Sequence, residues 1–171
     1  MTAGIQITAL EEHHRREEFD CGVEALNTYL RQYARQNHER RIARTFVATD
    51  EDGRILGYYS LASASIEYRL LPGDYAKRLP RYRSIPAAII ARLAVDRRGQ
   101  GKGLGTRLLG DALRRILLAS DEIGIKVVLV DAKDEAAKRF YQSFGFRELS
   151  DAPMTLFLPS ETIVRGLLLS K

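Results

Sequence analysis

The sequence has one cysteine, three histidines and no tryptophan among its 171 residues. A single thiol cannot form an intrachain disulfide, and no metal-ligand spacing surrounds Cys21. No apolar run reaches the roughly 18 residues that a bilayer-spanning helix needs, and the N-terminus lacks the pattern of a secretory signal. We therefore expect a soluble, cytoplasmic protein that has no metal site and does not enter a membrane, with Cys21 as a buried thiol.

Positive charge is concentrated in the middle of the chain. The net charge is +5, and residues 51–110 carry eleven basic and five acidic residues. Residues 1–50 carry seven basic and eight acidic residues, whereas residues 111–171 carry nine of each. The middle segment therefore holds the whole excess, which indicates a phosphate-rich ligand.

The hydrophobic pattern predicts an α/β domain with a mixed sheet. Alternating or continuous apolar runs indicate strands at residues 5–10, 45–49, 55–66, 85–95, 126–130, 146–149 and 155–158. Residues 67–84 are rich in Arg, Tyr and Pro and indicate a surface excursion, while the apolar residues 163–169 suit a short helix or a strand. No repeat or linker divides the chain, so we expect one domain over residues 1–171.

Three amphipathic segments predict helices. The second runs over residues 104–119, and the third begins near Asp134, a residue of the N-cap type. The first precedes the strand at 45–49, and we expect its buried stripe to consist of Val23, Leu26, Leu30, Tyr33 and Ala34.

A glycine-rich loop, Gln-Gly-Lys-Gly-Leu-Gly at residues 100–105, follows the apolar strand and opens the second helix. The N–H groups of a helix start have no intrahelical partners, and the helix dipole adds partial positive charge there. Glycine lets a ligand approach the backbone and permits positive φ. This arrangement is typical of a pyrophosphate site.

Other interpretations of this loop fit less well. A P-loop needs a lysine directly before Ser or Thr, but Gly103 is followed by Leu104. A dinucleotide-binding loop belongs near the start of a βαβ unit, with an acidic residue about 20 residues later. Here the loop lies past the middle of the chain, after a predicted hairpin. A glycine-rich turn without a ligand remains as the structural alternative.

Two motifs resemble those of GNAT-superfamily N-acetyltransferases. The first is Gln100-x-x-Gly-x-Gly105 preceded by ARLAVD at residues 91–96, which is similar to the acetyl-CoA-binding motif. The second is AKRFYQSFGF at residues 137–146, about 40 residues later, which is similar to the family's helix-and-turn signature. The resemblance implies the GNAT fold, in which two neighbouring parallel strands splay apart, helices flank the sheet and acetyl-CoA enters the gap.

The same resemblance implies roles for individual residues in binding acetyl-CoA. The backbone of Leu93 and Val95 is expected to meet the pantetheine arm. The pyrophosphate is expected at the residues that follow, namely Gln100, Gly101, Lys102, Gly103, Leu104, Gly105 and Thr106. Two interpretations of Lys102 are open: a direct contact with phosphate, or a loop lysine that is simply solvated.

Acetyl transfer needs a neutral amine, a polarised thioester and an acid for the departing thiolate. Tyr141 aligns with the tyrosine that many GNAT enzymes place near the CoA sulfur, which implies a catalytic acid. A core aromatic is the alternative interpretation of this residue. The three histidines all lie in the N-terminal third, so no histidine base is expected. Asp131, at the end of a predicted strand, is a candidate polar group or a residue that fixes the next loop.

Four further segments resemble the GNAT toxins of bacterial toxin–antitoxin modules: FDCGVEALNTYL at 19–30, ARTF at 43–46, GYYSLA at 57–62 and IARLAVD at 90–96. Such toxins acetylate the α-amine of aminoacyl-tRNA and stop translation, and small ribbon-helix-helix antitoxins neutralise them. The resemblance implies the same substrate and partner here. It also allows a homodimer, because related toxins are often dimers.

The basic middle segment suits a tRNA substrate. Its arginines are candidate phosphate contacts, and Tyr68, Tyr75 and Tyr82 are candidates for stacking on bases. A solvated basic loop is the alternative, and so are an enzyme for small amines or protein N-termini and an inactive CoA- or RNA-binding module. The candidate tRNA contacts are Arg78, Arg81, Arg83 and Arg92.

Overall fold

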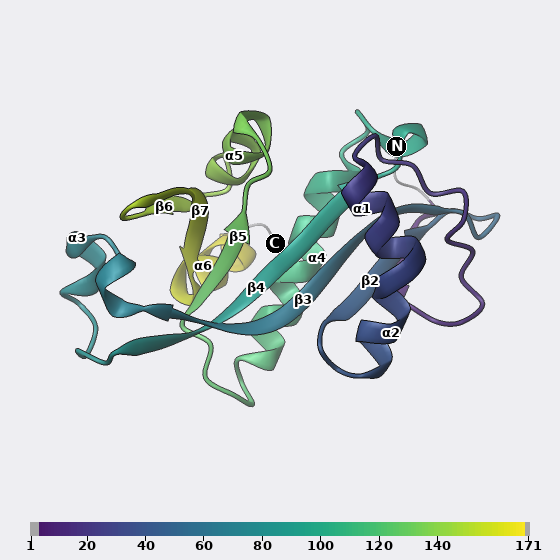
Figure 1. Ribbon diagram of the computed structural model, residues 1–171. Coiled ribbons are helices and arrows are strands. Elements are labelled where there is room, and N and C mark those ends of the chain that lie inside the picture. The colour runs from purple at the N-terminus through teal and green to yellow at the C-terminus, as the bar shows by residue number, and fades with distance from the viewer. Residues whose placement is uncertain (1–3, 170–171) are drawn as a thin grey trace. The chain divides into compact units, whose positions relative to one another are not determined.

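The computed structural model describes residues 4–169, with side chains through residue 166. The chain divides into two compact units, and β3, β4 and α4 contribute residues to both. Unit 1 comprises Met1–Ala62 and Ala91–Leu113, and unit 2 comprises Ser63–Ile90 and Arg114–Lys171. The strands follow the order β1-β2-β3-β4-β5-β7-β6, with a parallel β4–β5 pair beside antiparallel pairs (Figure 1). The predicted mixed α/β sheet is therefore confirmed.

Unit 1 contains β1 (Gln6–Ala9), β2 (Arg44–Thr49) and most of the predicted hairpin partner β3 (Ile55–Glu67). Both β1–β2 and β2–β3 are antiparallel. Asp50 closes the hairpin, because its Oδ1 accepts hydrogen bonds from the backbone N–H groups of Asp52 and Arg54, each at 2.9 Å. Gly53 in this turn has φ of +79°, so the turn forms where the sequence predicts it.

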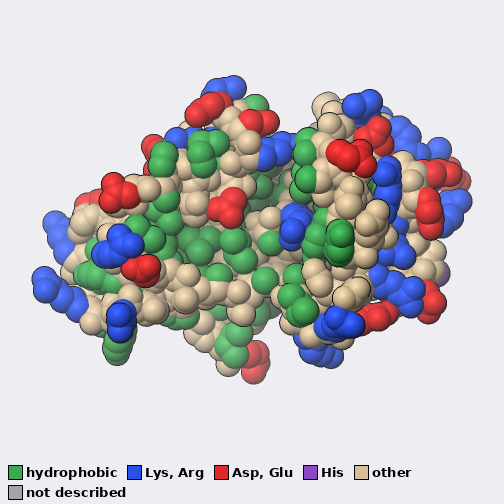
Figure 2. Space-filling view, in the orientation of Figure 1, with side chains coloured by type: hydrophobic (Ala, Val, Ile, Leu, Met, Phe, Trp, Pro, Cys, Tyr) green, Lys and Arg blue, Asp and Glu red, His purple; other side chains and the backbone are tan. Residues whose placement is uncertain are grey.

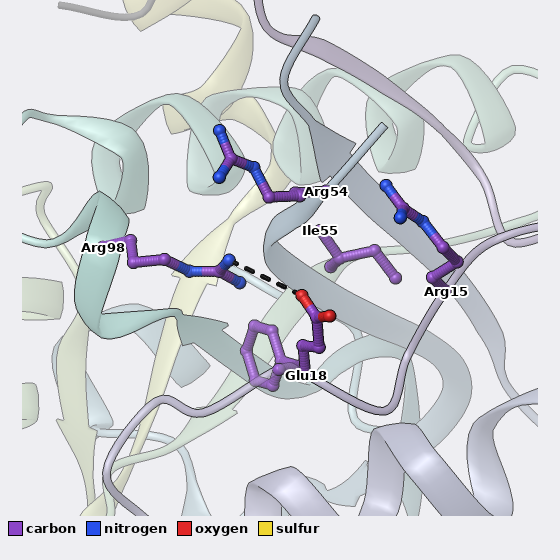
Figure 3. A pocket seen from close by; sticks show the side chains of 6 residues that line it. Arg15, Glu18, Arg54, Ile55 and Arg98 are labelled. Atoms are coloured by element: carbon purple, nitrogen blue, oxygen red, sulfur yellow. Dashed lines mark ion pairs between the residues drawn. The ribbon is translucent and has the colours of Figure 1, made fainter. Parts of the chain in front are cut away.

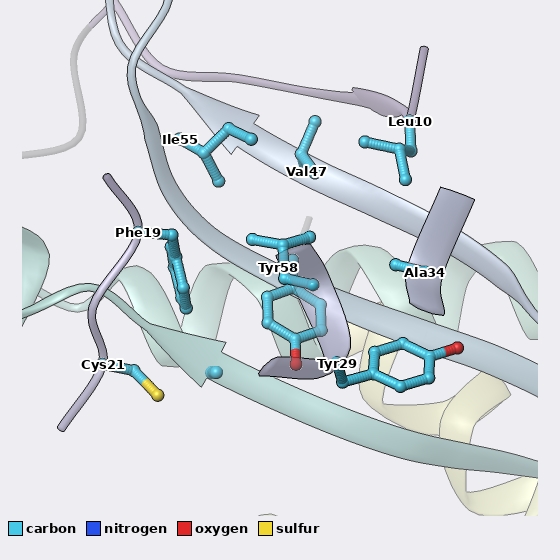
Figure 4. Packing of buried hydrophobic residues seen from close by; sticks show 10 residues of the cluster. Leu10, Phe19, Cys21, Tyr29, Ala34, Val47, Ile55 and Tyr58 are labelled. Carbon is cyan, nitrogen blue, oxygen red and sulfur yellow. The ribbon is translucent and has the colours of Figure 1, made fainter. Parts of the chain in front are cut away.

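The first predicted helix is three segments: α1 (Glu24–Thr28), the π-helical η1 (Tyr29–Tyr33) and α2 (Ala34–Glu39). Leu30 and Ala34 are buried as expected, in a cluster with Phe19, Val47 and Tyr58 (Figure 4). The expectation for Tyr33 is wrong, because its side chain is 52% exposed. A π-turn holds about one residue more than an α-turn, so the side chains that follow its start point in a different direction, and Tyr33 at the end of η1 faces solvent.

Helix α4 (Leu104–Ala119) has the bounds that its amphipathic pattern predicts. Leu108, Leu109 and Ala112 are fully buried. Gly57 of β3 permits close approach of this helix, since a Cβ there would lie 2.8 Å from Leu108 Cδ1. Helix and strand therefore pack closely at Gly57, where a larger residue would require neighbouring atoms to shift.

Unit 2 is built on β5 (Val127–Asp131), β6 (Arg147–Leu149) and β7 (Ala152–Pro159), which follow the start of β4 (Ser84–Val95). Its helices are α3 (Gly73–Ala76), α5 (Glu135–Gln142) and α6 (Ser160–Leu169), so the C-terminal apolar residues form a helix. As predicted, Asp134 caps α5, with its Oδ1 accepting from Ala137 N at 2.8 Å. None of the described helices is long and apolar enough to cross a membrane.

The predicted surface excursion at residues 67–84 is only partly correct. Leu71, Tyr75 and Ala76 are buried in a core cluster of unit 2 with Val127 and Phe157. The Tyr75 and Phe157 rings lie 5.5 Å apart. Periodicity could not predict this, because α3 has only four residues and its burial depends on strands distant in the sequence.

Candidate functional site

The loop between β4 and α4, residues 96–106, is here called the cofactor loop. Asp96 organises its first turn and is almost fully buried. Its carboxylate accepts from the backbone N–H of Arg98 at 2.8 Å and of Asp20 at 2.9 Å, and pairs with the Arg98 guanidinium at 2.9 Å. Burial raises the pKa of Asp96, but these hydrogen bonds outweigh burial and lower the pKa overall. The ionised Asp96 carboxylate therefore holds the start of the cofactor loop in place.

Gly101 and Gly103 give the cofactor loop its backbone path. Their φ angles are +76° and +80°, in the region that favours glycine, and no described atom lies within 4 Å of a Cβ built at either position. Leu104 then begins α4, whose first N–H groups lack intrahelical acceptors. Leu104 is buried and anchors the helix start, whereas Gly105 is half-buried and Thr106 is exposed. An open backbone surface with donor groups suits the pyrophosphate of acetyl-CoA.

Two predicted cofactor residues use their side chains to hold this loop. Gln100 Nε2 donates to the carbonyl oxygens of Val95, at 2.9 Å, and Cys21, at 3.1 Å. Lys102 Nζ donates to the Arg98 carbonyl at 3.1 Å. Both side chains therefore brace the backbone that the sequence predicts to bind the ligand.

Strand β4 continues beyond its parallel partner. Pairing with β5 runs from Ala87–Val127 to Ile90–Val130, and among the described residues it goes no further. Residues 91–95 of β4 therefore extend past the last β5 partner. Leu93 and Val95 lie in this extension and are half-buried. The Val95 carbonyl is already bound by Gln100, so its N–H is the group left to consider for the pantetheine arm.

Arg92 lies in the same extension and contacts an aromatic ring. Its guanidinium carbon is 3.7 Å from the centroid of the Tyr29 ring, a close cation–π contact. No described residue forms an ion pair or hydrogen bond with this guanidinium. The sequence identified Arg92 as a candidate contact but did not predict its aromatic partner.

Tyr141 of α5 combines a buried ring with an uncommitted hydroxyl. The ring is 6% exposed and lies 5.3 Å from the Phe140 ring and 5.6 Å from the Phe146 ring. No described residue hydrogen-bonds to its hydroxyl. Burial, with a smaller effect of the Asp131 carboxylate, raises the pKa of Tyr141 to about 12. The hydroxyl is therefore protonated at neutral pH and can donate to a ligand.

Asp131 has a partner of its own. Its Oδ1 accepts from Thr155 Oγ1 at 2.8 Å, which links the end of β5 to the middle of β7. This contact agrees with the interpretation of Asp131 as a residue that fixes the strand end.

Residues 77–83, here called the arginine segment, follow α3. Arg78, Arg81 and Arg83 are exposed, and Figure 2 shows Lys and Arg side chains projecting around the α3 end of the β3–β4 hairpin. The Arg78 guanidinium lies 5.2 Å from the centroid of the Tyr75 ring, while Arg81 and Arg83 have no side-chain partner among the described residues. The segment presents positive charge to solvent.

The tyrosines of this region differ in their availability. Tyr82 is 66% exposed. Tyr75 is buried and donates its hydroxyl to Glu161 at 3.3 Å, so the prediction that it stacks on bases is wrong. Tyr68 is half-buried and donates to the Ala76 carbonyl at 2.6 Å. Tyr82 is therefore the best candidate of the three for stacking.

A small pocket in unit 1 carries several charges (Figure 3). Its arginines are already engaged: Arg15 donates to the Asp52 carbonyl at 2.9 Å, Arg54 pairs with Asp50 at 2.9 Å, and Arg98 pairs with Asp96. We therefore assign the pocket a structural role. It is lined by Arg15, Glu18, Phe19, Arg54, Ile55 and Arg98.

Sequence reasoning missed the role of Asp96 and the partners of Gln100. An Asp followed by Arg-Arg-Gly directly after a strand is a turn signal that could have identified Asp96. No local signal links Gln100 to Cys21, because 79 residues separate them.

Comparisons with known proteins agree with this geometry. A family model described as an acetyltransferase (GNAT) domain matches residues 41–148. The chain is 41% identical over 140 residues to a tRNA-acetylating toxin of Mycobacterium tuberculosis, which covers 82% of each chain. Both proteins thus match over most of their length.

Solved structures of the toxin AtaT are also similar. AtaT complexed with acetyl-methionyl-tRNAfMet has a TM-score of 0.89 and 32% identity, covering 95% of this chain and 99% of that chain. A tyrosine-to-phenylalanine mutant of AtaT, bound to the C-terminus of the antitoxin AtaR and acetyl-CoA, has a TM-score of 0.81 and 29% identity. That match covers 98% of this chain and 99% of the other.

Proposed function

Because the chain belongs to the GNAT acetyltransferase family, we propose that it is a toxin that acetylates the α-amine of aminoacyl-tRNA and thereby blocks translation. The observation that supports this substrate most strongly is the 41% identity to a tRNA-acetylating toxin over 82% of both chains. AtaT, of similar fold, is bound to an acetylated aminoacyl-tRNA in its own structure. We treat residues 1–171 as one catalytic domain.

Acetyl-CoA supplies an acetyl group activated as a thioester. We assign its pyrophosphate to the N–H groups of the cofactor loop, at the positive-φ glycines Gly101 and Gly103 and the start of α4. Gln100 and Lys102 hold that backbone in place through the carbonyls of Val95 and Arg98. The fit rests on open backbone, so it depends little on side-chain charge.

We assign Tyr141 the role of donor to the departing sulfur. In the transfer, the amine nitrogen bonds to the acetyl carbon while the carbon–sulfur bond breaks and leaves negative charge on sulfur. The nitrogen then loses one proton, which replaces the proton that Tyr141 gives to sulfur. With its pKa raised to about 12, the Tyr141 hydroxyl keeps its proton across the physiological range and can donate it toward that charge. The α-amine has an ordinary pKa of about 7.7–8.0, and ester formation lowers it. Much of the amine is therefore neutral in the cell, and a histidine base is not required.

The arginine segment is the proposed surface for tRNA phosphates, with Arg78, Arg81 and Arg83 as contacts and Tyr82 beside them. The antitoxin is proposed to be of the ribbon-helix-helix class, and AtaT provides precedent for an antitoxin C-terminus bound to a similar toxin. We further propose that the protein acts in the cytoplasm, where charged tRNA is found, and as a homodimer.

The test is acetyl transfer from labelled acetyl-CoA to three acceptors in parallel: charged tRNA, the free amino acid and a small amine. We expect charged tRNA to be acetylated with the highest kcat/KM. Preferential acetylation of the free amino acid or the small amine would show that this acceptor, and not charged tRNA, is the substrate. Equal labelling of uncharged tRNA would contradict the assignment of the α-amine.

A further inference from the structure

The three arginines between residues 92 and 98 differ in their acidic partners. Arg97 lies 3.7 Å from an Asp20 oxygen, and Arg98 is paired with Asp96. Arg92, half-buried on the same strand-and-loop segment, has no acidic partner among the described residues. Since buried charges in proteins are usually paired, an unpaired, partly buried guanidinium indicates that something else completes it.

The aromatic platform under Arg92 is rigid. Tyr29 is 5% exposed, its ring stacks on Tyr58 at 6.3 Å with 14° between the planes, and its hydroxyl accepts from Asn37 Nδ2 at 3.2 Å. Tyr58 in turn donates to the Leu26 carbonyl at 2.7 Å. The position of the ring is therefore fixed by three separate elements of unit 1.

A backbone irregularity begins at the platform residue. Tyr29 begins the π-helical η1, and the Ala34 N–H bonds to the Tyr29 carbonyl, five residues back. A regular α-helix would follow the predicted stripe and bury Tyr33, which is exposed instead. π-Turns inside helices are frequent at functional sites, and this one begins at the residue whose ring lies under Arg92.

The orientation of β4 puts Arg92 and the cofactor backbone in adjacent positions. Side chains alternate along a strand, so Arg92 shares a face with Ala94, which is packed in the cluster of Tyr29 and Tyr58. Leu93 and Val95, on the opposite face, belong to the backbone assigned to the pantetheine arm. Arg92 is thus the neighbour of Leu93 on the strand along which the acetyl group is expected.

We propose that Arg92, stacked on Tyr29, is a positioning residue that binds the phosphate on the 5′ side of the terminal nucleotide of the acceptor. This inference rests on the proposed tRNA substrate. The terminal ribose carries the aminoacyl ester and that phosphate, which makes it the phosphate nearest to the reacting amine. A guanidinium offers planar paired N–H donors that match phosphate oxygens, and stacking on Tyr29 leaves those edge donors free.

The test pairs Arg92→Gln with charged tRNA in which the phosphodiester before the terminal adenosine is a neutral methylphosphonate. Each change alone should lower kcat/KM about 10- to 100-fold, the effect of one or two hydrogen bonds to a charged group. The two together should lower it no further than either alone, because they remove the same contact. The loss should lie mainly in KM, and Arg92→Lys should recover part of it.

Matched variants separate positioning from folding. Tyr33→Phe changes an exposed tyrosine outside this contact, so it should retain activity. Tyr29→Leu removes the platform and should raise KM for unmodified charged tRNA but not for the methylphosphonate tRNA. Acetyl-CoA affinity and the melting temperature of Arg92→Gln should match the wild type.

Three outcomes would overturn the inference: additive losses, an unaffected Arg92→Gln variant, or a loss confined to kcat. A wild-type protein that does not acetylate charged tRNA at all would instead overturn the proposed function.

Discussion

The cofactor loop and the arginine segment are both basic, but they use their charges differently. In the cofactor loop, Arg98 and Lys102 bind a carboxylate and a carbonyl of the loop itself. In the arginine segment, the side chains of Arg81 and Arg83 are exposed and have no hydrogen-bond, ion-pair or ring partner among the described residues. The first region therefore offers backbone donors braced by charge, and the second offers the charge itself. Acetyl-CoA binding should therefore be sensitive to backbone changes in the cofactor loop, whereas tRNA binding should be sensitive to charge changes in the arginine segment.

Tyr141→Phe has the largest expected effect. Both basic regions are proposed to bind ligands, whereas Tyr141 is proposed to act in the chemical step itself. Removing only the hydroxyl should lower kcat on the order of 10²–10⁴ while acetyl-CoA affinity holds. Steady-state kinetics on charged tRNA measure this. Tyr33→Phe, at an exposed tyrosine, is the control and should be silent. Near-normal turnover of Tyr141→Phe would make Tyr141 a core aromatic.

Gly103→Val tests whether the cofactor loop works through its backbone. A β-branched residue at φ of +80° is strained by about 1–3 kcal/mol, so the loop should shift and acetyl-CoA affinity should fall roughly tenfold or more. Calorimetry on the folded protein measures it. Gly110→Val, also open around its Cβ but within α4, should bind normally. Equal affinity in both variants would contradict a backbone site.

Charge reversal of Arg78, Arg81 and Arg83 to Glu tests whether the arginine segment binds tRNA through its positive charge. The apparent KM for charged tRNA should rise by about tenfold at low salt, and the log–log salt slope should fall by roughly 0.7 for each phosphate that is no longer neutralised. The same three residues changed to Lys should keep most of the slope. A phosphate-free aminoacyl ester should be acetylated as before. Equal losses on the ester and on tRNA would assign these arginines to the fold.

Lys102→Gln should have the smallest effect. Its ammonium is exposed and binds the Arg98 carbonyl, and exposed charge contacts contribute about 0.2–1 kcal/mol. Acetyl-CoA affinity should therefore change less than about fivefold. A loss as large as that of Gly103→Val would show that Lys102 binds the phosphate directly and would blur the contrast between the two regions.

Local chemistry explains which parts of the fold could be predicted. The bounds of α4 and the cap at Asp134 follow from periodicity and side-chain reach within a few residues. The positive φ of Gly101 and Gly103 follows from the need for backbone that only glycine adopts readily. Tyr33 was misplaced because one π-turn changes the helical phase, and no residue pattern marks that turn.

The site could be predicted in its backbone but not in its side-chain contacts. Gln100 was identified, yet its acceptor at Cys21 comes from a distant part of the chain. Arg92 was identified as a candidate contact, yet the ring beneath it belongs to Tyr29, in a distant part of the chain. Tyr75 was a candidate for stacking on bases, but its ring is buried against Phe157. These contacts depend on tertiary structure, which a single sequence does not encode locally.

The central claim is that the acetyl group is transferred to the α-amine of the amino acid on tRNA. The most direct measurement is mass spectrometry of charged tRNA after reaction with acetyl-CoA and nuclease digestion. We predict a terminal adenosine that carries an N-acetylated aminoacyl group, formed by the wild type and almost absent with Tyr141→Phe. Acetyl groups on nucleobases, or unmodified aminoacyl-adenosine after complete consumption of acetyl-CoA, would contradict the account.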